Sequence, residues 1–317
     1  MLGKITLEEH FALTETLGPG SDDLHRRLRD FGGSRISEMD EFGIQFSVLS
    51  LNAPAVQGIL EINAAVEMAR RANDFLADEI SKRSDRFGGF AALPMQDPDL
   101  ATEELTRCVK ELGFVGANVN SFTQKDEPET HIFYDIPKYR SFWASVQELD
   151  VPFYLHPRNP VTERIPQFDG HPWLTYSAWA FAFDAALHAL RLMCSGLFDD
   201  YPNLQLILGH LGERIPFDLW RVDHRIEEDP KNIPAQKSLR EYMRTNVHVT
   251  TSGQFYDPPL HLTLNELGID RVMFSVDYPF ESMEKGCNWF DNAKLTKEEQ
   301  IAIGRTNAIK LLKLNLD

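Results

Sequence analysis

The feature that most constrains the fold of this chain is the regular recurrence of short apolar runs rich in Val, Ile, Leu and Phe. Longer stretches that carry charges, and apolar residues at helical spacing, separate the runs. The runs cover residues 4–10, 46–52, 87–94, 114–120, 151–157, 204–210, 246–253 and 271–277. Near-continuous apolar strands that alternate with helices are typical of a parallel sheet covered on both faces. Because there are eight runs, we predict an α/β fold, a (β/α)8 (TIM) barrel, with a doubly wound open sheet as the alternative.

The sequence shows no repeat, low-complexity tract or Gly/Ser-rich linker, so we expect a single domain over residues 1–317. The longest polar stretch, residues 121–131, is expected to be a surface loop. No apolar segment resembles a signal peptide or a membrane span, so we expect a cytoplasmic protein that does not bind membranes. The three cysteines lack the spacing of a thiolate zinc site. The excess of 48 acidic over 32 basic residues argues against nucleic acid as a partner.

Residue types that bind metal ions occur at the ends of four predicted strands. The first run ends in Glu8 and His10, the fifth in His156, the sixth in His210 and the eighth in Asp277. Since the active site of a (β/α)8 barrel is built at the carboxyl ends of its strands, these side chains are expected to converge at one mouth. Residues i and i+2 of a strand face the same side, so Glu8 and His10 can both face the interior. Two carboxylates with imidazoles suit one divalent ion and leave positions open for water or substrate.

Several motifs extend a resemblance over nearly the whole chain. They are, in order, "LEEHF", "SLNAPAVQ", "FAALPMQDPD", "CVKELGFVGA", "DVPFYLHPRNP", "ILGHLGE", "TTSG" and "FSVDYPFE". On these motifs the chain resembles the amidohydrolase superfamily and, within it, the branch of decarboxylases that act on ortho-hydroxybenzoates. The resemblance is closest to the γ-resorcylate (2,6-dihydroxybenzoate) type. Many relatives that act on 2,3-dihydroxybenzoate or salicylate carry "EEAF" where this chain has "EEHF", so His10 favours the γ-resorcylate type.

The resemblance implies one divalent metal ion per subunit and no organic cofactor. Its expected ligands are Glu8, His10, His156 and Asp277. Hydrolytic relatives begin with HxH and carry a lysine on the fourth strand that becomes carbamylated and bridges two metals, whereas this chain has ExH and no lysine in residues 114–120. One ion is therefore expected. Zn²⁺ and Mn²⁺ both suit a mixed nitrogen and oxygen site, and Mg²⁺ remains an alternative.

The implied reaction is a reversible, non-oxidative decarboxylation in which a proton reaches the carboxyl-bearing ring carbon before CO2 leaves. The resemblance implies Asp277 as the proton donor, and His210 is the second candidate. Glu213 is expected either to orient the His210 imidazole or to favour a helix N-terminus. The residues expected to contact the substrate are Arg221, Asn120, Phe11, Trp179 and Phe280.

The expected partners are a small aromatic hydroxy acid and CO2 or bicarbonate, and the resemblance implies a homodimer or homotetramer. Two other functions would use the same residues. A mononuclear metal hydrolase could open a lactone or amide by activating water on the same ligands. A catalytically inactive binding protein on the same barrel is the third interpretation, and the presence of every expected ligand argues against it.

Overall fold

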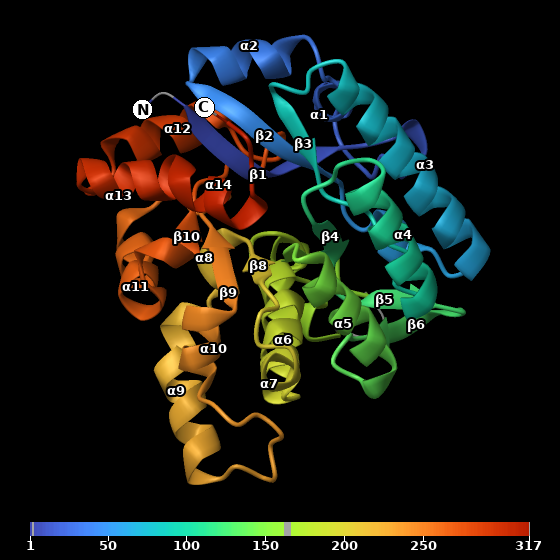
Figure 1. Ribbon diagram of the computed structural model, residues 1–317, viewed down its shortest axis with the longest axis vertical. Helices are drawn as coiled ribbons and strands as arrows, with labels where there is room; N and C mark the ends of the chain where they lie inside the picture. Colours follow the sequence, from blue (N-terminus) through green and yellow to red (C-terminus); the bar gives the residue numbers. More distant parts are fainter. Residues whose placement is uncertain (2, 162–165, 317) are drawn as a thin grey trace.

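Parallel strands form the centre of the fold, and helices lie around them (Figure 1). The computed structural model describes residues 1, 3–161 and 166–316. Hydrogen-bonded strands follow the orders β1-β2-β3 and β10-β9-β8-β7-β4. Single parallel bridges, Ala91 with Ala117 and Glu9 with Tyr278, join these two groups at both edges. The strands therefore close on themselves, and the predicted (β/α)8 barrel is confirmed over the open sheet.

Every barrel strand overlaps one of the predicted apolar runs. The strands are β1 (Lys4–Phe11), β2 (Ile44–Leu51), β3 (Phe87–Gly89), β4 (Ala117–Asn120), β7 (Phe153–His156), β8 (Leu206–Leu208), β9 (Val247–Thr250) and β10 (Val272–Met273). The polar stretch expected to be a loop instead forms an antiparallel hairpin of β5 (Thr123–Lys125) and β6 (Glu127–Ile132). Asp126 reverses the chain between these two strands with a φ of 62°. That expectation was wrong because a hairpin held by backbone hydrogen bonds does not require apolar residues.

The helices lie mostly between successive barrel strands. They are α1 (Asp22–Leu28), α2 (Ser34–Glu41), α3 (Ile62–Ser81), α4 (Pro98–Lys110), α5 (Arg140–Leu149), α6 (Ala180–Cys194), α7 (Leu197–Asp200), α8 (His210–Glu213), α9 (Ile215–Glu228), α10 (Leu239–Thr245), α11 (Asp257–Leu267), α12 (Met283–Asn292), α13 (Lys297–Ile301) and α14 (Asn307–Leu312). Side-chain caps fix several starts, as at Asp97, which accepts from two backbone N–H groups of α4. Within the described residues, no helix combines the length and apolar character needed to cross a membrane.

Apolar side chains form two layers, one on each face of the strands. The larger layer lies between the strands and the surrounding helices. The smaller layer fills the barrel interior and consists of Ile5, Leu7, Phe46, Val48, Phe90, Tyr154, Ile207 and Met273, with Ala308 and Leu312 from α14. These side chains fill the centre of the barrel, which is therefore a packed core and not a pore.

Strand β1 contains a bulge that changes which side chains face the interior. Its pairing with β2 shifts register between Thr6 and Glu9. The backbone N–H groups of Leu7 and Glu8 both donate to Oγ of Ser275, at 2.6 and 3.0 Å. Successive N–H groups of a regular strand point to opposite sides, so a shared acceptor marks a bulge. The extra residue lets Leu7 fill the core while the next residue, Glu8, also faces inward.

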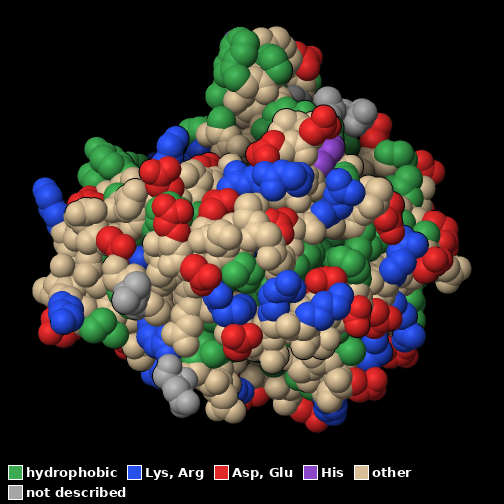
Figure 2. Space-filling model, turned by 90° about the horizontal axis from the view of Figure 1, so that it is seen from above, with side chains coloured by type: hydrophobic (Ala, Val, Ile, Leu, Met, Phe, Trp, Pro, Cys, Tyr) green, Lys and Arg blue, Asp and Glu red, His purple; other side chains and the backbone are tan. Residues whose placement is uncertain are grey.

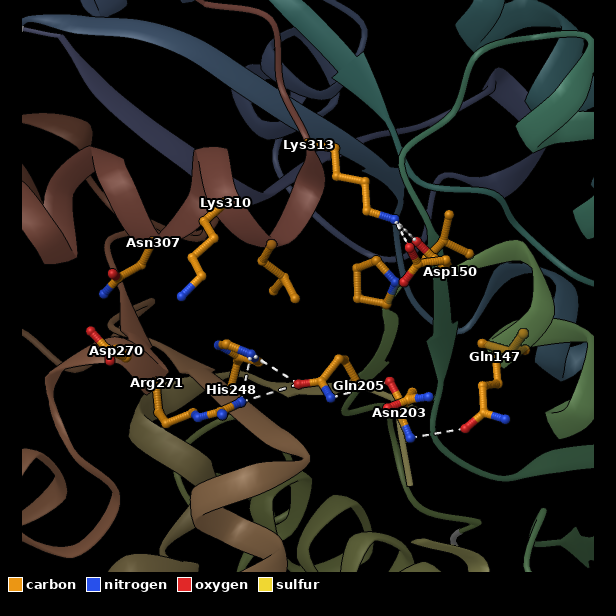
Figure 3. A pocket seen from close by; sticks show the side chains of 14 residues that line it. Gln147, Asp150, Asn203, Gln205, His248, Asp270, Arg271, Asn307, Lys310 and Lys313 are labelled. Atoms are coloured by element: carbon orange, nitrogen blue, oxygen red, sulfur yellow. Dashed lines mark hydrogen bonds and ion pairs between the residues drawn. The ribbon is translucent and has the colours of Figure 1, made fainter. Parts of the chain in front are cut away.

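A hollow of about 270 Å³ lies at the amino-terminal end of the barrel strands, opposite the mouth (Figure 3). Two of its basic side chains have partners there: Lys313 pairs with Asp150, and Arg271 donates to Gln205 and His248. On the face seen in Figure 2, basic side chains lie in small groups beside acidic ones. This mixture differs from the continuous basic surface that nucleic-acid binding requires.

Candidate metal centre

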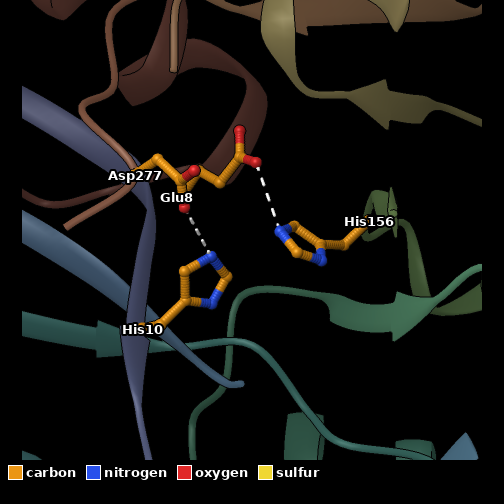
Figure 4. A group of neighbouring side chains, drawn as sticks. All are labelled: Glu8, His10, His156 and Asp277. Carbon is orange, nitrogen blue, oxygen red and sulfur yellow. Dashed lines mark ion pairs between the residues drawn. The ribbon is translucent and has the colours of Figure 1, made fainter. Parts of the chain in front are cut away.

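Four side chains predicted as metal ligands meet at the carboxyl end of the barrel (Figure 4). Glu8, His10, His156 and Asp277 each offer one ligand atom, and these atoms all lie within 4.8 Å of one another. Nε2 of His10 lies 3.1 Å from Oδ1 of Asp277, and Nε2 of His156 lies 3.4 Å from Oε1 of Glu8. The fold thus brings together residues that are up to 269 positions apart in sequence.

The donor atoms of this cluster fit a divalent cation. Among the described residues, Glu8 Oε1, His10 Nε2 and Asp277 Oδ1 are buried and form no hydrogen bond, although the last two lie 3.1 Å apart. Buried polar atoms are normally paired, and two buried carboxylates that face each other repel unless a positive charge lies between them. Two imidazole nitrogens and two carboxylate oxygens are a donor set that both Zn²⁺ and Mn²⁺ accept. The three orphaned atoms therefore point to one ion among them.

Three hydroxyl groups hold the other carboxylate oxygen of Glu8. Thr250 donates from Oγ1 to Oε2 at 2.7 Å, and the hydroxyls of Tyr154 and Ser252 donate to the same atom. Oε1 is thereby left facing the cluster. Burial raises the pKa of Glu8, against the opposing effects of a nearby imidazole and of the Ser252 and Tyr154 hydroxyls. None of these three residues was predicted from the sequence, although strand alternation places Tyr154 on the same face as His156, two positions later.

Gly209, directly after β8, has its backbone close to the carboxylate of Glu8. A Cβ atom at this position would lie 2.7 Å from Glu8 Oε1, which is closer than real contacts allow. A larger residue would push into the carboxylate that the hydroxyls hold. The glycine before His210 is therefore a spatial requirement of the cluster.

Each histidine ligand candidate is fixed through its Nδ1 atom. Ser50 Oγ lies 3.1 Å from Nδ1 of His10, and Asn120 Oδ1 lies 3.0 Å from Nδ1 of His156. Both Nε2 atoms can then face the cluster. Burial lowers the pKa of His156, and the neighbouring His10 adds to this effect, so the imidazole stays neutral as a ligand must. Asn120 was expected to contact substrate, which stays a prediction, and its amide oxygen lies against His156.

His210 and Glu213 form a pair at the edge of the cluster. Nδ1 of His210 lies 2.7 Å from Oε1 of Glu213, and Nε2 lies 3.6 Å from Oδ2 of Asp277. Burial lowers the pKa of His210, but the charges of Glu213 and Glu8 outweigh it and the net shift is upward. The chain from His210 to Arg214 has positive φ throughout, so a left-handed turn and not a helix N-terminus brings the pair together.

Phe11 lies in the hydrophobic core, which corrects the expectation that it stacks on a substrate ring. Its side chain is 1% exposed, and its ring centroid lies 5.8 Å from that of Phe31 and 6.1 Å from that of Phe75. The reason is strand alternation: His10 faces the barrel interior, so the next side chain faces the helices.

The other predicted substrate contacts lie at or beside the mouth. The Phe280 ring is 49% exposed, and its centroid lies 5.6 Å from that of His10. Trp179 and Arg221 line a groove of about 380 Å³ between α6 and α9, whose lining also includes Glu213. The guanidinium of Arg214 covers the Trp179 ring at 3.7 Å. The structure therefore places Phe280 beside the cluster, and Trp179 and Arg221 in the adjoining groove.

Comparison with known proteins places this geometry in a family. A model of the amidohydrolase family matches residues 10–314. A γ-resorcylate decarboxylase of Rhodococcus jostii is 54% identical over 328 residues, which cover 99% of this chain and 100% of the relative. The crystal structure of a 2,6-dihydroxybenzoate decarboxylase complexed with 2,6-dihydroxybenzoate is 51% identical, with a TM-score of 0.97 over 99% of this chain and 100% of that one. A dihydroxybenzoic acid decarboxylase of Polaromonas sp. JS666, with bound manganese and the inhibitor 2-nitroresorcinol, is 50% identical, with a TM-score of 0.97 over 100% of this chain and 98% of that one.

Proposed function

The chain belongs to the amidohydrolase family, and from this premise we propose that it is a metal-dependent, non-oxidative decarboxylase whose substrate is 2,6-dihydroxybenzoate. The observation that carries the proposal is near full-length identity above 50% with γ-resorcylate decarboxylases, combined with the four converging ligand candidates. These relatives cleave a carbon–carbon bond, which favours a carboxy-lyase over a hydrolase of a lactone or amide.

Decarboxylation of an arene sets a specific chemical demand. Direct loss of CO2 would leave a carbanion in the plane of the ring, where the π system cannot delocalise it. Protonation of the carboxyl-bearing carbon before the bond breaks avoids this species. An ionised ortho-hydroxyl group supplies electron density to that carbon, and CO2 leaves as the ring becomes aromatic again. In reverse, CO2 or bicarbonate would carboxylate resorcinol.

We assign the metal site to Glu8, His10, His156 and Asp277, with Mn²⁺ as the expected ion, Zn²⁺ as the alternative and no organic cofactor. When bound, a divalent ion supplies positive charge that favours the ionised hydroxyl and carboxylate groups of the substrate. Manganese is preferred here because the Polaromonas relative binds it.

Two side chains are candidates for the proton donor. Asp277 is the donor that the family resemblance implies, but a carboxylate beside a cation resists protonation. Nε2 of His210 lies 3.6 Å from Asp277, and its orientation is fixed by Glu213. His210→Asn tests the choice because it leaves all four proposed ligands in place. Loss of turnover with the metal retained would favour His210, and turnover near the wild-type rate would favour Asp277.

We assign substrate contacts to residues of the mouth and its approach. Phe280 is exposed beside the His10 ring and is placed to pack against a planar aromatic acid. Trp179 and Arg221 line the groove that adjoins Glu213, where a guanidinium suits a carboxylate or phenolate. These residues define the entrance of the site.

We also propose that the chain forms a homodimer or homotetramer through the outer surface of α9. Phe217 and Trp220 on this helix are 78% and 64% exposed, and neither lines the groove assigned to substrate. Large aromatic side chains gathered on one surface mark protein interfaces. Sedimentation velocity tests this assignment, since a monomer would contradict it.

The function is tested by identifying the products. Manganese-loaded protein mixed with 2,6-dihydroxybenzoate should release resorcinol and CO2, and the same assay with 2,3-dihydroxybenzoate and salicylate should give catechol and phenol more slowly. A panel of lactones should yield no proton release. Failure to turn over any ortho-hydroxybenzoate would overturn the proposal.

A further inference from the structure

Glu9 lies between two proposed ligands in sequence, and its carboxylate accepts from the backbone on both sides of a third, Asp277. Its side chain is 1% exposed and does not belong to the cluster of ligand atoms. Oε1 accepts from the N–H of Val276 at 3.0 Å, and Oε2 accepts from the N–H of Tyr278 at 2.9 Å. These two amides flank Asp277 directly. Both oxygens of one buried carboxylate are therefore used on either side of a single residue.

The backbone at Asp277 has a conformation that needs such support. Its φ is 77°, in the left-handed region that residues other than glycine seldom adopt. Its own N–H donates to the carbonyl oxygen of Glu8 at 3.0 Å. Three consecutive amides, of residues 276–278, thus donate to Glu8 and Glu9. A strained conformation persists when its surroundings over-determine it, and the pair Glu8–Glu9 does this here.

The segment before Asp277 also binds the backbone of β1, so the two segments stabilise each other. Oγ of Ser275 accepts from Leu7 and Glu8, the two N–H groups that form the bulge in β1. On the same side, the buried guanidinium of Arg35 donates to the carbonyl oxygen of His10 at 2.7 Å. Each of these contacts ends on a residue that is, or adjoins, a proposed ligand.

We propose that Glu9 is a positioning residue that fixes the left-handed backbone of Asp277 and so aims its carboxylate at the metal. This inference rests on the metal site proposed above and extends it beyond the ligands. Glu9 touches neither the ion nor the substrate in this account. Its removal should let residues 276–278 relax and should weaken the grip on the ion through Asp277 alone.

Two substitutions separate positioning from packing. Glu9→Gln keeps the volume and one acceptor oxygen, but it turns an NH2 group toward the second amide. Glu9→Ala removes both acceptors. Glu104→Gln is the matched control, because Glu104 is also 1% exposed and bonds to Asn73 and Arg107 on α3 and α4, outside the cluster. The Glu104→Gln variant loses a buried carboxylate but leaves every contact of the proposed metal site in place.

The readouts are the Mn²⁺ affinity of metal-free protein by calorimetry, the visible absorption of the Co²⁺-loaded protein and the urea unfolding midpoint. We expect Glu9→Gln to lose about tenfold and Glu9→Ala about a hundredfold in Mn²⁺ affinity, the range typical for groups that orient ligands. The Co²⁺ spectrum should change in both variants. Glu104→Gln should lower the unfolding midpoint and leave affinity and spectrum at wild-type values.

The inference would be overturned if both Glu9 variants bound Mn²⁺ with wild-type affinity and an unchanged Co²⁺ spectrum. It would also fall if Glu104→Gln weakened binding as much as Glu9→Gln. If Glu9→Ala does not fold, Glu9→Gln carries the test. Wild-type protein that binds Mn²⁺ tightly but turns over no hydroxybenzoate would overturn the proposed reaction. The effect of Glu9 on Mn²⁺ affinity could still be measured in that case.

Discussion

Nδ1 of His210 lies 2.7 Å from Oε1 of Glu213, across a left-handed turn in which every residue has positive φ. Glu213 is 2% exposed, so its carboxylate is held in place and its charge is little screened. The contact fixes which imidazole nitrogen faces Glu8 and Asp277. The turn thus converts a buried carboxylate into an orienting group for the imidazole nearest the cluster.

Glu213→Gln should lower kcat for 2,6-dihydroxybenzoate about 10- to 100-fold while the protein keeps its metal. The amide retains a hydrogen-bonding atom but loses the charge that supports a protonated imidazole. Steady-state kinetics with metal analysis of the same sample measures both quantities. Glu241→Gln, at the exposed start of α10, is a control that should leave kcat unchanged. Loss of metal from the Glu213 variant would contradict this role.

Tyr154→Phe should weaken Mn²⁺ binding about tenfold, because Glu8 loses one of three hydroxyl donors to Oε2. The phenyl ring keeps the packing of the barrel interior. Equilibrium dialysis against buffered Mn²⁺ measures the change. A variant with wild-type affinity and a raised KM would instead show that Tyr154 acts on the substrate.

Asn120→Ala should also weaken metal binding about tenfold, since His156 loses the partner of its Nδ1 atom. At saturating Mn²⁺ the KM for 2,6-dihydroxybenzoate should stay near the wild-type value. The opposite pattern, a raised KM with unchanged metal affinity, would support the direct substrate contact that the sequence suggested.

The buried imidazole of His188 should make the folded protein less stable as the pH falls. The ring is fully buried in α6, and its Nε2 accepts from the N–H of Tyr134 at 2.9 Å. Burial, with a smaller effect of Arg191, lowers the pKa of His188 to about 3. The unfolded chain binds this proton near pH 6.5 and the folded chain does not, so its contribution is complete above pH 6.5 and is lost as the pH falls toward 3.

Between pH 8 and pH 5 this one group should lower the free energy of unfolding by about 2 kcal/mol. His188→Gln keeps an acceptor that does not titrate, so urea unfolding of the variant should show a shallower loss over that range. If the free energy of unfolding fell equally with pH in both proteins, His188 would not be the neutral buried group described here.

Local sequence patterns predicted most of the barrel and the four converging ligand candidates. Alternation alone placed Glu8 and His10 on one face. It could not show that Leu7 shares that face, because the bulge depends on Ser275, which is 268 residues away. Hydroxyl residues such as Tyr154 are common in strands and carry no distinctive signal, so a role on Glu8 is visible only in three dimensions.

Phe11 shows the limit of reasoning from neighbourhood in sequence. It follows a ligand candidate at a strand end, where aromatic residues often line a pocket, but strand alternation turns it into the core. Arg221 shows another limit, since helix α9 carries it into a groove beside the mouth. Side-chain direction decided both positions.

The central claim is that one divalent ion, held by Glu8, His10, His156 and Asp277, supports decarboxylation of 2,6-dihydroxybenzoate. Titration of metal-free protein with Mn²⁺, while resorcinol release is followed, tests it most directly. We predict no release without metal and a rate that rises to a plateau at one Mn²⁺ per chain. Full release by the metal-free protein, or a plateau only at two ions per chain, would contradict the account.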